Sequence, residues 1–301
     1  MKFNGTLNEV IRGIWMLEPQ YVLQSAPLLS SFFEGVAASG SKPQGEEQNP
    51  EAAVFNIYAP DGELYGHRIE DKTPAGSTAV IGVKGAIIKE GDYCSWGADE
   101  ITNMIYRADR DPKITEIILD LDTPGGSVNA IAPFIECGQN ITTPVRKTVD
   151  QCCSLGMWIA CAFPGPIMAS NTISLTTGSV GVQLSFMDAK PYYEKQGYKF
   201  HRITPPESYE KNEIFEKVLA GDYDQINKEV LSPMAVKFQN AVKAFLPKLV
   251  DEPGVLNGKT YNYEESMRVG FIQGTSSVRT MLEDKKKRAQ LTEYRRSSAH
   301  S

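Results

Sequence analysis

Histidine is scarce in this chain of 301 residues, which contains His67, His201 and His300 and no others. Histidine is the commonest base beside a catalytic serine and the commonest metal ligand. His67 precedes the predicted core strands, His300 lies close to the end of the sequence, and His201 falls in a predicted strand, where we expect a surface or core role. A serine–histidine pair is therefore not expected.

Paired cysteines are also lacking. The five cysteines form an odd set without C-x-x-C spacing, and they lie in segments that are otherwise apolar. Zinc sites and disulfide frameworks need regularly spaced pairs, so we interpret all five, including Cys152 and Cys153, as reduced thiols of a cytoplasmic protein. Neither a metal nor another cofactor is expected.

An excess of basic charge and a long apolar run are the other two absences. The net charge is −6 with a pI near 5.3, which argues against nucleic acid or an anionic membrane as the main partner. The basic groups at 285–288 and 295–296 are interpreted as a solvated helix face or a frayed chain end. Arg12, Glu18 and Pro19 interrupt the apolar N-terminal stretch well before the roughly 20 residues of a membrane span, so we expect no membrane anchor.

Three regions are predicted from the pattern of the chain. Residues 1–52 form an N-terminal arm that ends in a polar linker, because 39–52 is small, polar and rich in Gly and Pro. Residues 53–275 form one large domain. Residues 276–301 form a charged tail, either helical or disordered.

The large domain alternates short apolar runs with segments of helical period. The runs 78–87, 114–122 and 144–150 are predicted as buried strands, and the segments 101–112 and 127–141 between them as helices. Strand–helix–strand repetition predicts βαβ units and a mainly parallel sheet with flanking helices. The fold class is therefore α/β.

Two features at strand ends could carry chemistry. Gly125 and Gly126 follow a strand and precede a helix, where free backbone N–H groups can form an oxyanion hole; the alternative is a tight turn that needs glycine only for its backbone angles. Ser154 follows another strand at the predicted start of a helix. It is either an ordinary N-cap or a nucleophile presented at the top of the sheet.

A nucleophilic serine needs a base, and where histidine is scarce a lysine can take its place. Burial lowers the pKa of a lysine, so that the neutral amine can accept the serine proton at ordinary pH. We therefore expect a partly buried lysine beside Ser154.

Four short motifs occur in a familiar order: LDLDTPGGSV at 119–128, CSLGMWIA at 153–160, TGSVGV at 177–182 and EKQG at 194–197. In this order and spacing they resemble the signal-peptide peptidase A family of serine peptidases. Within that family the likeness is greatest to phage head-maturation proteases such as the lambda minor capsid protein C, which share a MLEP stretch near the start, here at 16–19. The resemblance covers roughly residues 12–275.

The resemblance implies a ClpP/crotonase-like fold, Ser154 as nucleophile, and oxyanion donors at Gly125 and Gly126. It also implies a lysine base, and here the sequence departs from the family pattern. An ungapped match places Tyr209 at that position, and a shift of two residues supplies Lys211.

Three outcomes stay open at the position of the base. Lys211 is the preferred base, Lys199 is the alternative, and a degenerate, inactive site is the third outcome. Ser179, in the TGSVGV motif, is either an assisting hydroxyl or a turn residue.

The function implied is a serine endopeptidase with a Ser/Lys dyad. By resemblance it processes phage capsid, portal or scaffold proteins, in the host cytoplasm or the prohead, as a homo-oligomer. One alternative is an inactive protein of this fold that binds scaffold in a phage head. Another is a crotonase-like acyl-CoA enzyme, although no feature of the sequence would specifically hold the nucleotide of CoA.

Overall fold

The structure is a computed structural model that describes residues 14–17, 54–91, 96–185, 188 and 190–298. The predicted N-terminal arm and linker, residues 1–52, lie outside the described residues except for strand β1 (Ile14–Leu17). Cys94 and His300 also lie outside them.

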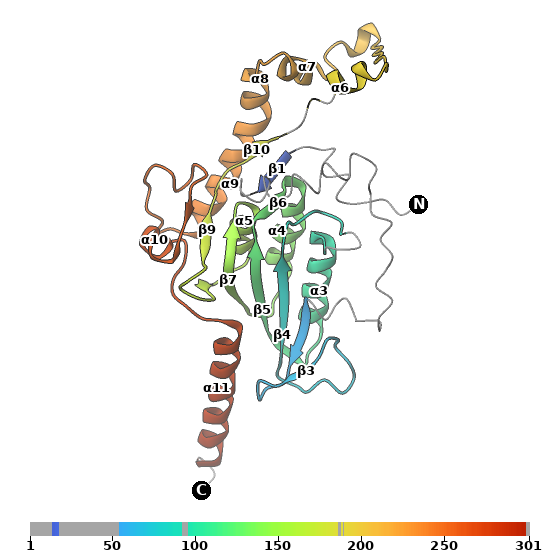
Figure 1. The fold of residues 1–301 in the computed structure, drawn as a ribbon. Helices are drawn as coiled ribbons and strands as arrows, with labels where there is room; N and C mark the ends of the chain where they lie inside the picture. The colour runs from blue at the N-terminus through green and yellow to red at the C-terminus, as the bar shows by residue number, and fades with distance from the viewer. Residues whose placement is uncertain (1–13, 18–53, 92–95, 186–187, 189, 299–301) are drawn as a thin grey trace.

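An eight-stranded sheet forms the centre of the molecule (Figure 1), with strand order β11-β9-β7-β5-β4-β2-β3 and β8 paired with β7. Strands β4, β5, β7, β8 and β9 run parallel, while β2, β3 and β11 are antiparallel additions. Their bounds are β2 (Phe55–Tyr58), β3 (Leu64–Gly66), β4 (Ser77–Lys84), β5 (Ile114–Thr123), β7 (Val145–Cys153), β8 (Ile167–Ala169), β9 (Thr176–Gly178) and β11 (Thr260–Tyr261). The predicted α/β class with a mainly parallel sheet is confirmed.

One face of the sheet is covered by helices α3 (Ala98–Arg110), α4 (Ile131–Asn140), α5 (Leu155–Ala162) and α9 (Ser232–Phe245). Helices α3, α4 and α5 connect successive parallel strands, so the predicted βαβ units are present. The periodicity that predicted α3 is also the pattern of its burial, because Ile101, Met104, Ile105 and Ala108 are all buried.

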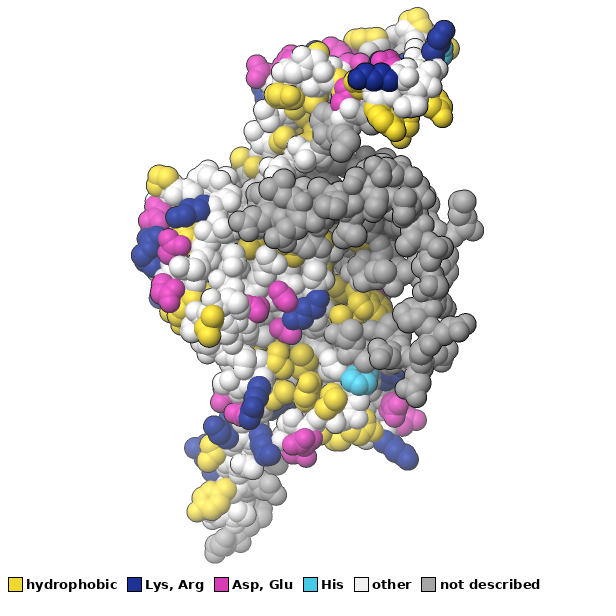
Figure 2. All heavy atoms as spheres, in the orientation of Figure 1, with side chains coloured by type: hydrophobic (Ala, Val, Ile, Leu, Met, Phe, Trp, Pro, Cys, Tyr) yellow, Lys and Arg dark blue, Asp and Glu magenta, His cyan; other side chains and the backbone are white. Residues whose placement is uncertain are grey.

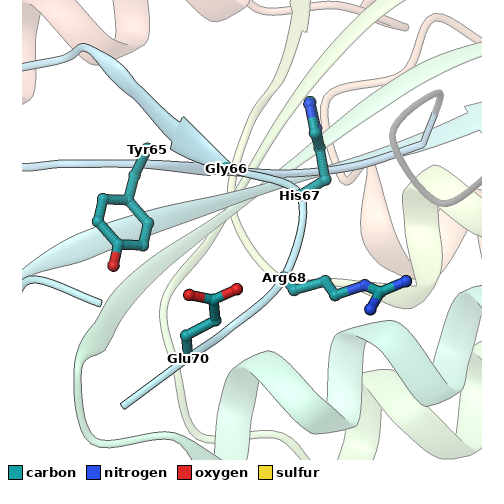
Figure 3. A pocket seen from close by; sticks show the side chains of 5 residues that line it. All are labelled: Tyr65, Gly66, His67, Arg68 and Glu70. Atoms are coloured by element: carbon teal, nitrogen blue, oxygen red, sulfur yellow. The ribbon is translucent and has the colours of Figure 1, made fainter. Parts of the chain in front are cut away.

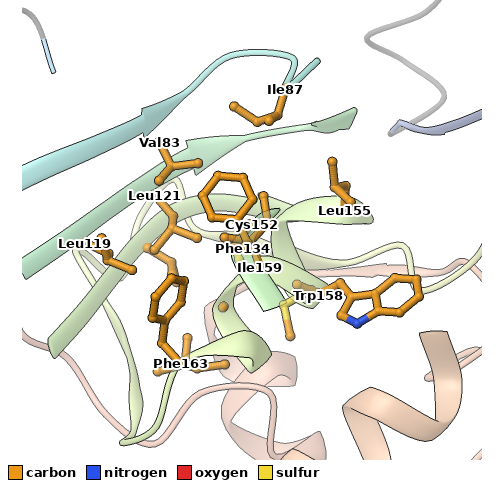
Figure 4. Close-up of a cluster of buried hydrophobic side chains, with 14 of the residues drawn as sticks. Val83, Ile87, Leu119, Leu121, Phe134, Cys152, Leu155, Trp158, Ile159 and Phe163 are labelled. Carbon is orange, nitrogen blue, oxygen red and sulfur yellow. The ribbon is translucent and has the colours of Figure 1, made fainter. Parts of the chain in front are cut away.

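The core lies between these helices and the sheet. Figure 4 shows Leu119 and Leu121 of β5 packed with Phe134 of α4 and Ile159 of α5, and all four are fully buried. Each such side chain contributes about 2 kcal/mol of transfer free energy. Helix α5 also packs on α9, where the rings of Trp158 and Phe238 stack with centroids 4.9 Å apart.

A second, small sheet lies at the end of the molecule where α5 begins. It has the order β10-β1-β6, with β6 (Gly125–Ser127) and β10 (Gln183–Leu184) both antiparallel to β1. The predicted glycine turn after β5 is thus itself a short strand, paired with β1 on one side and bridged by Ile87 at Gly126 on the other.

Residues 190–231 form a helical arm that projects from the body (Figure 1). It contains α6 (Lys190–Lys195), η3 (Pro206–Ser208), α7 (Glu213–Leu219), α8 (Asp224–Ile226) and η4 (Asn227–Leu231). The prediction of a strand around His201, at 198–203, is wrong, because this stretch pairs with no strand among the described residues. Its aromatic residues mimic a strand pattern but have no sheet edge to join.

The chain continues through α10 (Tyr263–Val269) and ends in α11 (Val278–Ser298). Met281 and Leu282 pack with Val80 and Ile118 on the sheet face opposite the four helices. Beyond this contact α11 extends away from the body, and Figure 2 shows basic side chains gathered along it. No helix among the described residues is long and apolar enough to cross a membrane.

Candidate active site

Ser154 joins β7 to α5 in a strained conformation. Its φ of 52° and ψ of −118° belong to a region that non-glycine residues rarely occupy. The residue is 1% exposed, its amide donates to the Gly178 carbonyl at 2.8 Å, and its hydroxyl lies 3.4 Å from the Gly181 carbonyl. Its side chain makes no capping bond to α5, so it is not an ordinary N-cap.

This geometry matches what a nucleophile needs. A sharp turn from strand to helix presents the hydroxyl at the top of the sheet, and the helix N-terminus favours negative charge on it. Residues held in sparsely populated backbone regions cost about 1–3 kcal/mol and cluster at functional sites.

The glycine turn lies beside this serine. Thr123 is the register partner of Cys152, and a Cβ placed on Gly156 would lie 2.7 Å from Thr123 Cγ2, so the first turn of α5 contacts the turn closely. The Thr123 hydroxyl lies 2.6 Å from the Gly85 carbonyl oxygen, to which it can donate. Gly125 has a φ of 117°, which favours glycine.

The two glycines differ in their surroundings. The Gly125 amide donates to Thr123 Oγ1 at 3.1 Å, so that donor is occupied within the turn. Gly126 packs against the backbone of Ile87, where an added Cβ would lie 1.9 Å from the carbonyl oxygen. Glycine at 126 is therefore required by close packing, whatever its role in catalysis.

Ser179 is brought to the same place. It is 6% exposed with a φ of 53°, and its amide donates to the Lys259 carbonyl at 2.8 Å. Its neighbours Gly178 and Gly181 supply the carbonyls that contact Ser154. Two of the three non-glycine residues with positive φ in the described part of the chain thus lie on adjoining segments.

The structure does not bring the predicted bases to Ser154. Lys211 is exposed on the helical arm, where its amide donates to the Ser208 carbonyl and its own carbonyl accepts from Arg202. Lys199 is exposed on the same arm. Among the described residues, neither ammonium has a hydrogen bond or ion pair with the Ser154 turn.

Sequence reasoning missed a buried lysine. Lys147 of β7 is fully buried, and its ammonium donates to the carbonyls of Ala160 at 2.9 Å and Phe163 at 2.5 Å. Desolvation lowers the pKa of Lys147 to about 8. Both carbonyls lie at the C-terminal end of α5, whereas Ser154 precedes its N-terminal end, so Lys147 is not the base.

The described histidines lie away from this region. His67 Nδ1 is 2.7 Å from Asn56 Oδ1, and His67 lines a surface hollow of about 370 Å³ with Tyr65, Arg68 and Glu70 beside β3 (Figure 3). His201 is exposed on the helical arm. No cluster of three or more His, Cys, Asp or Glu among the described residues has the geometry to hold a metal.

Comparisons with known proteins give a partial likeness. No protein-family model matches the chain. It is 34% identical over 124 residues to Protease 4 of Haemophilus influenzae and 34% identical over 119 residues to Protease 4 of Salmonella typhi. These matches cover 40% and 37% of this chain but 20% and 19% of the relatives, so the chain's likeness spans about a fifth of their length.

Two solved structures are similar at lower identity. Both are variants of the 1510-N membrane-bound stomatin-specific protease, one with alanine for lysine and a bound substrate peptide, the other with alanine for serine. Each is 18% identical; the TM-scores are 0.44 and 0.41, covering 70% and 68% of this chain and 80% and 82% of theirs. Similarity to Protease 4 over about two fifths of the chain is thus the sequence relationship that these comparisons establish.

Proposed function

We propose that this chain is a serine endopeptidase of the signal-peptide peptidase A kind, built on a ClpP/crotonase-like scaffold, with Ser154 as its nucleophile. The observation that carries the proposal is the strained backbone of Ser154 at the strand-to-helix turn, combined with a side chain that does not cap the helix. The similarity to two bacterial Protease 4 sequences supports the reaction class.

The proposed reaction has two steps. The Ser154 hydroxyl attacks a peptide carbonyl carbon while a neutral lysine takes the hydroxyl proton, and the C–N bond breaks as that proton passes to the leaving amine. Water then attacks the acyl ester, again with the lysine as base, and releases the carboxylic acid. Backbone N–H groups at Gly125 and Gly126 would stabilise the oxyanion in both steps, which requires the Gly125 amide to leave Thr123 Oγ1.

Lys211 is the proposed base, with Lys199 as the alternative. The helical arm that carries both has two buried side chains, Val218 and Ile226, among its described residues. It exposes nine large apolar side chains: Tyr192, Tyr193, Tyr198, Phe200, Ile203, Tyr209, Phe215, Leu219 and Tyr223. A projecting segment with so much exposed apolar surface is typical of an interface.

Contact with a second copy of the chain would account both for the exposed apolar side chains of the helical arm and for the distance of its lysines from Ser154. We infer a homo-oligomer in which the arm of one copy packs on the body of another, which buries the apolar side chains. The same contact would carry the lysine to the partner's site and desolvate it, as a neutral base requires.

The proposed substrates are polypeptides. Residues 125–127 and 183–184 both pair with β1 (Ile14–Leu17) close to Ser154. An extended substrate that took the place of β1 could pair with both segments through main-chain hydrogen bonds. By the resemblance of the four motifs, these polypeptides would be capsid, portal or scaffold proteins of a phage, cut in the host cytoplasm or the prohead.

A fluorophosphonate probe, which forms a covalent bond with an activated serine, tests the proposal. We expect wild-type protein to be labelled at Ser154 and to cleave casein, and we expect Ser154→Ala to lose both. The matched control is Ser277→Ala, at the start of α11, which should behave as wild type. An unlabelled wild-type protein that is folded would instead identify an inactive protein of this fold.

A further inference from the structure

Lys147 is an unusual residue for the place it occupies. It lies on the helix-covered face of β7, where its backbone pairs with Leu119 of β5 and Ile167 of β8, and none of its surface is exposed. Burying an ammonium is costly unless its donors are satisfied, and lysine is almost never fully buried without partners. A methionine would fill the same space without that cost.

The partners of Lys147 connect one end of α5 to the strand that precedes it. Its ammonium donates to the carbonyls of Ala160 and Phe163, the last turn and the C-cap of α5, and lies 4.3 Å from the centre of the Phe245 ring of α9. A cation at this end of a helix is favoured by the unpaired carbonyls and by the helix dipole.

Strand β7 and helix α5 are therefore joined at both ends. At one end the chain itself connects them through Ser154. At the other end, about 12 Å away along a helix of eight residues, the connection is the side chain of Lys147. With both ends held, α5 cannot tilt or slide against β7 without breaking these two hydrogen bonds.

We propose that Lys147 is a positioning residue for Ser154, which holds the C-terminal carbonyls of α5 to β7 and so fixes the helix that begins at the nucleophile. Only the effect of Lys147 on the reactivity of the Ser154 hydroxyl rests on the proposed function. The connection between helix and strand stands on the contacts alone.

The charge on Lys147 contributes to this connection. Desolvation lowers the pKa of Lys147 to about 8, and the thiols of Cys152 and Cys161 are the titratable groups that act on it; the other elements that contact it present Leu119, Ile167 and Phe245. Above this pH the ammonium becomes an amine with two donors and no charge. The hold on the α5 carbonyls then weakens without any change of sequence.

The test compares Lys147→Met, which keeps the volume and removes the donors, with Lys147→Gln, which keeps one amide group as donor. The control is Lys113→Met, because Lys113 also donates to a distant backbone carbonyl, that of Glu70, but far from Ser154. For each full-length variant the maximal labelling rate by the fluorophosphonate and the half-saturating probe concentration are measured across pH 6 to 9, well below the melting temperature.

We expect Lys147→Met to lower the maximal rate at least tenfold with the half-saturating concentration changed less than twofold, and Lys147→Gln to fall between it and wild type. The excess of the wild-type rate over that of the Met variant should shrink as pH rises through about 8, because the neutral amine keeps two donors but loses its charge. A folded Met variant labelled at the wild-type rate overturns the proposal. Failure of both variants to fold also overturns it, because Lys147 would then serve the stability of the whole domain.

Hydrogen–deuterium exchange separates this proposal from the proposed function, because it needs no activity. In the Met variant the amides of 155–163 should exchange at least tenfold faster, while those of 114–123 stay protected as in wild type. Equal protection of 155–163 in both proteins contradicts the connection itself. An unlabelled wild type with this exchange difference would instead reject the peptidase and retain the role of Lys147 in holding α5.

Discussion

The amide of Ser154 donates a 2.8 Å hydrogen bond to the carbonyl of Gly178, the last residue of β9. This bond fixes the strand-to-helix turn from the neighbouring parallel strand. Gly178 is itself confined, with a φ of 101° and with an added Cβ 2.6 Å from the Lys259 carbonyl oxygen. The conformation of the candidate nucleophile thus depends on close backbone packing between β9 and β11.

Replacing Gly178 by alanine tests this dependence. We expect Gly178→Ala to lower the free energy of unfolding by about 2 kcal/mol or more, because it combines an unfavourable φ with a backbone clash, and to slow fluorophosphonate labelling. Gly62→Ala is the control, since Gly62 has a φ of 85° but an added Cβ meets nothing within 4 Å. Urea unfolding and labelling of both variants make the comparison. Equal labelling rates would show that Ser154 does not depend on Gly178.

The backbone strain at Ser154 predicts opposed effects on stability and activity. Both Ser154→Ala and Ser154→Gly should abolish labelling. Only glycine adopts φ 52° and ψ −118° without strain, so Ser154→Gly should be more stable than Ser154→Ala by about 1 kcal/mol. Urea denaturation of the two variants measures this difference, and identical stabilities would mean that the turn relaxes when the side chain changes.

Local patterns predicted the sheet and the place of Ser154, but not the surroundings of the lysines. Strand and helix periods are properties of short segments, so β5, β7 and α3 could be read from residues a few positions apart. In β7, alternation puts Lys147 on the same face as Val145 and Val149, and this was the signal that could have identified a buried lysine. This signal was obscured by the neighbouring Arg146, because two adjacent basic residues suggest an exposed segment.

The position of Lys211 could not be obtained from the sequence in the same way. Whether a lysine on a projecting arm reaches a serine depends on packing between segments far apart in the chain, or on a second copy. Residue spacing carries information on neither.

The pH dependence of stability tests the ionisation of Lys147. Its folded-state pKa, about 8, is below the ordinary value of 10.5, so between these values the unfolded chain binds more protons and the free energy of unfolding rises with pH. Below pH 8 the folded protein carries the full free-energy cost of burying the charged ammonium of Lys147. Raising the pH from about 7 to about 10 should therefore stabilise wild type relative to Lys147→Met by about 2–3 kcal/mol. Because the other ionisable groups are shared by both proteins, a constant difference would mean that Lys147 keeps an ordinary pKa.

Complementation between two inactive variants tests whether the base comes from a second copy. We expect Ser154→Ala and Lys211→Ala to be inactive when each is expressed alone. In mixed oligomers, an intact Ser154 can meet an intact Lys211 from its neighbour, so co-expression in equal amounts should recover about a quarter of wild-type labelling and casein cleavage if copies associate at random. Lys199→Ala in place of Lys211→Ala is the matched control, and it should be active without a partner.

Each other outcome of this experiment has a separate meaning. An oligomer on size exclusion that recovers no activity would place the lysine in the same copy as its serine, reached by closure of the helical arm. Full activity of Lys211→Ala alone would remove Lys211 from the mechanism, and an inactive Lys199→Ala would then make Lys199 the base. Recovery near a quarter, with both single variants inactive, requires that the arm of one copy serve the Ser154 of another, because no single chain in the mixture holds both residues.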